Sequence, residues 1–183
     1  TMTLDANGPT GTIVVDTLNG GSDIVMSSTS DASVEHAEAV NDFTATVGSF
    51  TTGLNSIVTG GDITVTSPGA VDLGNSTAGG FVFVDGQSIA FNAIDAGDFV
   101  SLNATGTAPG TEGIAGGSIT ALGSIDLFGN SISVASITGD NSMSAIGTGG
   151  SVAVDQADVA GLITVSAAGD VTGSYSAGGD IFL

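Results

Sequence analysis

This sequence of 183 residues contains no lysine, no arginine and no cysteine. Proteins that bind nucleic acids displace phosphate counterions with cationic side chains, so we expect no nucleic-acid partner. The same absence excludes attachment to anionic membranes through a polybasic segment. Without cysteine there is no disulfide scaffold, no thiolate zinc site and no cysteine nucleophile. No apolar run approaches the ~18 residues of a membrane-spanning helix, so we also expect no membrane insertion.

The charge that is present has one sign. Nineteen aspartate and glutamate residues give a formal net charge of −19, while 41% of the residues are hydrophobic and 30 are glycine. Disordered chains combine high charge with few β-branched residues, whereas this chain is rich in valine and isoleucine. We therefore predict one folded domain over residues 1–183.

Short internal repeats dominate the sequence. Gly-Gly pairs are followed by alternating apolar residues at 60–65, 79–84, 116–121, 149–154 and 178–183. Alternation with a period of two predicts β-strands with one buried face. Glycine, asparagine, aspartate and serine fill the gaps between these units, which is typical of turns.

Two all-β architectures fit this pattern. A β-sandwich needs longer strands joined by hairpin turns, whereas a right-handed parallel β-helix needs short strands and tight corners. We predict the parallel β-helix (β-solenoid), with the β-sandwich as the alternative. The predicted core residues are Ile63, Val65, Val82, Val84, Ile119, Val152, Val154, Ile163, Val165 and Ile181.

The segment 29–47 departs from the repeat pattern. Asp31 is a suitable N-cap, and Val34 and Ala37 follow at helical spacing. The same stretch also alternates like a strand through Val34 and His36. We predict a short irregular or helical insertion near 29–47, which would cap the solenoid or cover its side.

The repeats resemble a known family. The Gly-Gly-Asp/Ser-Ile-x-Val openings, followed by Gly-Ala-Val-Asp-Leu at 69–73 or Gly-Ser-Ile-Asp-Leu at 123–127, resemble the repeats of filamentous-haemagglutinin-type adhesins. The resemblance covers about residues 57–183. It implies a secreted bacterial surface protein built as a long parallel β-helix, and it carries over no catalytic residues.

From these observations we expect an extracellular or cell-surface structural protein rather than an enzyme. Strand-like sequences at both ends of the chain favour end-to-end stacking of open coils. The partners would be other copies of the chain in a head-to-tail polymer, or neighbouring repeats of a longer chain. The protein would then be a subunit or segment of a self-assembling surface filament or adhesin stalk.

A second hypothesis assigns calcium to the acidic turns. Calcium takes six to eight oxygen ligands, and stacked turns place equivalent side chains about 4.8 Å apart. The candidate ligands are aspartates in glycine-containing turns: Asp62, Asp98, Asp140, Asp170 and Asp180. The protein would then be a calcium-dependent surface-layer or adhesin module, with Ca²⁺ as its cofactor.

A third hypothesis is a glycan-acting β-helix enzyme, because glycosidases use pairs of carboxylic acids. The close pairs in this sequence are Glu35 and Glu38, Asp95 and Asp98, and Asp155 and Asp158. The chain has no lysine or arginine with which to hold an acidic polysaccharide. We therefore predict no catalytic residues.

Overall fold

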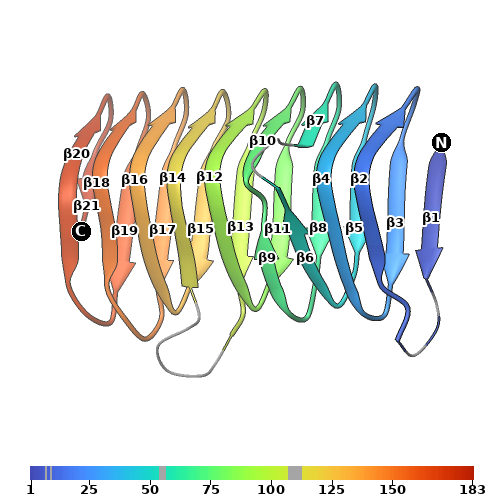
Figure 1. Ribbon diagram of the computed structural model, residues 1–183. Coiled ribbons are helices and arrows are strands. Elements are labelled where there is room, and N and C mark those ends of the chain that lie inside the picture. The colour runs from blue at the N-terminus through green and yellow to red at the C-terminus, as the bar shows by residue number, and fades with distance from the viewer. Residues whose placement is uncertain (7, 9, 54–56, 107–112) are drawn as a thin grey trace.

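The predicted parallel β-helix is confirmed. The computed structural model describes residues 1–6, 8, 10–53, 57–106 and 113–183, and this part of the chain forms strands and turns without a helix. All the strand pairings in it are parallel. Figure 1 shows the coils stacked in sequence order along one axis. The β-sandwich alternative is wrong, since its hairpins would pair antiparallel.

Two sheets form the walls of the solenoid. The ten-stranded sheet contains, in order, β1 (Met2–Ala6), β3 (Ile24–Ser28), β5 (Phe43–Thr46), β8 (Ile63–Thr66), β11 (Val82–Gly86), β13 (Val100–Ala104), β15 (Ile125–Gly129), β17 (Met143–Gly147), β19 (Ile163–Ala167) and β21 (Ile181–Phe182). The eleven-stranded sheet contains β2 (Ile13–Gly20), β4 (Asp31–Ala39), β6 (Ser49–Thr52), β7 (Ile57–Thr59), β9 (Ala70–Asp72), β10 (Asn75–Ala78), β12 (Ser88–Ala96), β14 (Gly113–Ala121), β16 (Ser131–Gly139), β18 (Val152–Val159) and β20 (Val171–Ala177).

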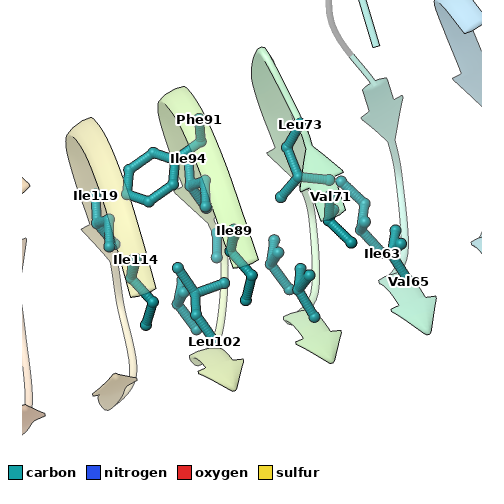
Figure 2. Packing of buried hydrophobic residues seen from close by; sticks show 14 of the residues in the cluster. Ile63, Val65, Val71, Leu73, Ile89, Phe91, Ile94, Leu102, Ile114 and Ile119 are labelled. Atoms are coloured by element: carbon teal, nitrogen blue, oxygen red, sulfur yellow. The ribbon is translucent and has the colours of Figure 1, made fainter. Parts of the chain in front are cut away.

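The register aligns equivalent residues of successive coils. Ile125 pairs with Met143, and Met143 pairs with Ile163 in the next coil. All three side chains are buried, with at most 1% of their surface exposed. Because neighbouring strands keep the same inward phase, the apolar residues form continuous columns along the axis. Figure 2 shows side chains from the two sheets meeting between the walls.

Nine of the ten predicted core residues are buried, with at most 3% of their surface exposed. The prediction is wrong for Ile181, which is 41% exposed. Its strand, β21, pairs with β19 on one side only, so no further coil covers the side chain.

The prediction of an irregular or helical insertion near 29–47 is wrong. This segment contains β4 and β5, which belong to the regular coils. Val34 and Ala37 both point inward, and the two residues between them, Glu35 and His36, both point outward. This double outward step produces the i, i+3 spacing that imitates a helix. It also means that the strict alternation expected for a strand fails at His36.

The double outward step recurs along the eleven-stranded sheet. In β12 the buried residues Phe91 and Ile94 are separated by Asn92 and Ala93, neither of which is buried. The pairing of β12 with β14 correspondingly runs from Phe91–Gly116 to Ala93–Ser118 without a partner for Asn92. Each long strand of this sheet thus contains two short inward-facing segments, which wrap around the core.

One glycine is required by a neighbouring aromatic ring. Gly116 pairs with Phe91 in the preceding coil, and a Cβ at Gly116 would overlap the Phe91 ring. Phe91 is 5% exposed and therefore occupies the inward space that a side chain at position 116 would need. The large side chain of Phe91 thus fills the space that is left free because Gly116 in the next coil has no side chain.

Candidate functional surface

A line of outward-facing residues runs along one corner of the solenoid, directly before the strands of the ten-stranded sheet. We name it the corner column, and its members are Asp23, Asp42, Asp62, Phe81, Phe99, Ser124, Ser142, Leu162 and Asp180. Backbone hydrogen bonds fix their alignment. The Ile24 N–H donates to the Asp42 carbonyl at 2.8 Å, and the same bond recurs from Phe43 to Asp62 and from Ile63 to Phe81 at 2.9 Å. Residues at equivalent positions of successive coils consequently lie next to one another.

Two of the aspartates in this column, Asp42 and Asp62, accept hydrogen bonds from backbone N–H groups. Oδ1 of Asp42 accepts a hydrogen bond from the N–H of Asp62 at 3.0 Å. Oδ1 of Asp62 accepts one from the N–H of Phe81, also at 3.0 Å. These carboxylates therefore satisfy turn amides of the following coil.

Asp23 has neighbours that favour its ionised form. Its Oδ2 accepts a hydrogen bond from Oγ1 of Thr1 at 2.9 Å, and its Oδ1 accepts one from Nδ2 of Asn41 at 3.2 Å. The bond from Thr1 and then that from Asn41 hold the pKa of Asp23 below its ordinary value of 3.8. This carboxylate thus stabilises the fold above its unfolded-state pKa, and the contribution is lost as the pH falls through the lower folded-state value.

The five candidate calcium ligands are spread along the rod. Asp62 and Asp180 belong to different coils of the corner column, while Asp98 and Asp140 lie at the same corner, in the turns before β13 and β17. Asp170 is in the turn before β20. Among the described residues, no group of three or more histidine, cysteine, aspartate or glutamate side chains could hold a metal ion. These aspartates are therefore not gathered into one site by the fold.

The close carboxylate pairs lie on the outside. Glu35 and Glu38 are both exposed on β4, and Asp155 and Asp158 are both exposed on β18. Of the third pair, Asp95 is exposed on β12 and Asp98 in the turn that follows.

The sequence analysis did not identify a cluster of phenylalanines on the outer face of the ten-stranded sheet. Phe81 and Phe99 are successive members of the corner column, and their rings are stacked with centroids 4.9 Å apart and an interplanar angle of 11°. Phe83 follows Phe81 by two residues and so points to the same face. All three are partly exposed. We name Phe81, Phe83 and Phe99 the Phe patch.

A signal for this patch was present in the sequence. In the segment 79–84, Val82 and Val84 take the buried phase, so Phe81 and Phe83 must take the outward phase. Large aromatic side chains in the solvent phase of a strand are informative, because burial would be more favourable. The stacking of Phe99 on Phe81 depends on the coil length and could not be read from the alternation.

No protein-family model, curated protein or solved structure matches the chain. Within the part of the chain that the structure describes, no helix is long and apolar enough to cross a membrane.

The response of stability to salt separates general charge repulsion from specific calcium binding. The chain carries a formal net charge of −19, so we expect sodium chloride to raise the melting temperature by a few degrees through screening. Calcium and magnesium chloride at equal ionic strength should have the same effect as each other. Differential scanning calorimetry measures all three curves. A rise with calcium that magnesium does not reproduce would contradict this expectation and support the calcium hypothesis.

Proposed function

We propose that this chain is a structural module of an extracellular or cell-surface rod, either a subunit of a self-assembling filament or a segment of an adhesin stalk. The observation that carries the proposal is the continuous parallel pairing through both sheets, from β1 to β21 and from β2 to β20. A solenoid of this kind supports load along its axis through backbone ladders and a continuous apolar core. The resemblance of its repeats to filamentous-haemagglutinin-type adhesins supports the extracellular setting.

The end coils leave apolar groups available for further stacking. Met2 and Leu4 of β1 are only partly buried, and Ile181 and Leu183 at the other end are 41% and 70% exposed. Equivalent positions in internal coils are fully buried. β1 and β21 each have a partner on one side only, so each offers unpaired backbone groups to another coil.

The register defines how two copies would join. Met2 pairs with Ile24, and Ile163 pairs with Ile181, in one inward column. A second copy would continue this column by placing its Met2 beside Ile181. Such a heterologous contact does not close on itself and therefore produces a filament.

The composition supports an exposed setting. Trypsin-like proteases cut after lysine and arginine, and the chain contains neither. The uniformly negative surface also opposes side-by-side aggregation of rods, whereas contact at the ends brings fewer charges together.

Electron microscopy of the purified chain, in calcium and in EDTA, tests the proposal. The ten-stranded sheet corresponds to a rod of roughly 45 Å at ~4.8 Å per coil. We expect fibres much longer than this in both conditions. Fibres in calcium alone would favour the calcium-dependent module, and single short rods in both conditions would contradict self-assembly.

Two neighbouring substitutions provide a matched comparison for this experiment. Ile181→Asp places a charge in the inward column at the proposed joint, whereas Phe182→Asp places the same charge on the outer face of β21. We expect Ile181→Asp to shorten the fibres to single rods and Phe182→Asp to leave long fibres. Equal fibre lengths for the two variants would show that assembly does not use this joint.

A further inference from the structure

The distribution of phenylalanine in this protein is unusual for a folded domain. Phe43, Phe50 and Phe91 are in the core, each at most 5% exposed. The other five phenylalanines of the eight in the sequence occupy outward positions: Phe81, Phe83, Phe99, Phe128 and Phe182. The chain has no tryptophan and one tyrosine, so most of its aromatic side chains lie outside. Three of these outward side chains form the Phe patch.

The Phe patch is bordered by carboxylates. Asp62 lies next to it in the corner column, with Oδ1 bound to the N–H of Phe81 at 3.0 Å. Asp85 is two residues after Phe83 on β11, hence on the same face of the sheet. Asp98 directly precedes Phe99 and is exposed. These carboxylates and aromatic rings therefore share one surface.

Nothing in the chain itself can neutralise this surface through a cationic side chain of lysine or arginine, because the sequence contains neither. A second copy has the same net charge of −19 and offers no such side chain either. The surface is thus unsuited to lateral contact between copies. Its charge complements a cationic partner, and its partly exposed rings complement a flat or apolar group.

The arginine side chain combines the two properties. Its guanidinium group is planar, stacks on aromatic faces and donates hydrogen bonds to carboxylates in a fixed fork. A lysine ammonium group is a compact and strongly hydrated charge, so it gains less from an aromatic surface. We propose that the Phe patch with Asp62, Asp85 and Asp98 is a docking surface for an arginine-bearing segment of a partner protein.

This inference is independent of the proposed filament. The Phe patch is on the side wall of the rod, in β11 and in the turns before β11 and β13, away from both end coils. A filament would present one such surface on each copy, and a partner with repeated arginines would gain from binding several at once.

Labelled hexa-arginine and hexalysine peptides, titrated into the intact protein and measured by fluorescence anisotropy, test the inference. Both peptides carry the same charge, so non-specific attraction to an acidic rod affects them alike. We expect hexa-arginine to bind at least about threefold more tightly, the size of an exposed cation–π contribution. Equal affinity for the two peptides would overturn the proposal.

The fold itself offers conservative variants. Serine is the native corner-column residue at 124 and 142. The double variant with Phe81→Ser and Phe99→Ser therefore introduces a residue type that this column already contains. Thr64 pairs with Phe83 in the adjacent coil, so Phe83→Thr is equally compatible. We expect either variant to abolish the preference for hexa-arginine while hexalysine binding stays unchanged.

A matched control removes a phenylalanine from the same sheet but outside the patch. Phe128 is 44% exposed on β15, and Ser166 occupies the equivalent outward position two coils away. Phe128→Ser should keep the full preference for hexa-arginine. Loss of the preference in Phe128→Ser, or its retention in Phe83→Thr with an unchanged circular dichroism spectrum, would overturn the proposal.

Discussion

Val154→Asp is expected to destabilise the C-terminal coils strongly. Val154 is fully buried in β18, between β16 and β20, and the chain has no lysine or arginine that could pair with a buried carboxylate. The cost of a buried, unpaired charge is about 4 kcal/mol or more, which corresponds to a melting temperature lower by about 10 °C. Circular dichroism during heating measures the loss.

The neighbouring residue supplies the control for this substitution. Ala153 points outward from the same strand, so Ala153→Asp adds the same charge to the outer face. Its melting temperature should stay near that of the wild type. If both variants melted together, net charge rather than burial would be the cause.

The same variant has a defined pH dependence. Burial raises the folded-state pKa of a carboxyl group above its unfolded value, so the neutral form is favoured in the fold. The free-energy cost of the buried charge at position 154 is therefore absent below the unfolded-state pKa and grows as the pH rises above that value. The gap in melting temperature between Val154→Asp and the wild type should narrow in acid.

Gly116→Val is expected to destabilise the middle of the solenoid by about 3 kcal/mol or more, because overpacking forces side chains out of their rotamers and shifts the backbone. The new side chain would overlap the ring of Phe91 in the preceding coil. Neither Phe91 nor the pairing of β12 with β14 can move without disturbing the adjacent inward columns. Chemical denaturation measures the change in stability.

A compensating substitution shows whether the ring is responsible. Phe91→Leu reduces the side chain that fills the space over Gly116. We expect Gly116→Val to be less destabilising in the Phe91→Leu background than in the wild type, with a coupling energy of about 1 kcal/mol or more. Additive effects would locate the strain in the backbone and not at the ring.

The inward phase of most strands could be predicted from the sequence. Gly-Gly openings followed by alternating apolar residues identified Val82, Val84, Val152 and Val154 as core, because a period of two fixes which face each residue takes. The parallel β-helix followed from short strands separated by turn residues. These are local properties, and a local pattern suffices to determine them.

The alignment between coils could not be predicted, because coil length varies. The corner-column residues Asp42 and Asp62 are 20 positions apart, whereas Ser124 and Ser142 are 18 apart. A single repeat length therefore does not show which outward residues stack. The Phe patch depends on that alignment, and the double outward step at Glu35 and His36 led to the incorrect helical interpretation of 29–47.

The corner column has a consequence for the length of the molecule over evolutionary time. Ser124 and Ser142 occupy the same position in successive coils, with their hydroxyl oxygens 3.1 Å apart. Removing 18 residues, 124–141, would bring Ser142 into the place of Ser124. The following strands β17 and β18 would then pair with β13 and β14 with the same side chains facing inward. Gene duplication or deletion in units of one coil would thus lengthen or shorten the rod in steps of ~4.8 Å. The length of such a rod could thus change during evolution without changes in the residues of its core.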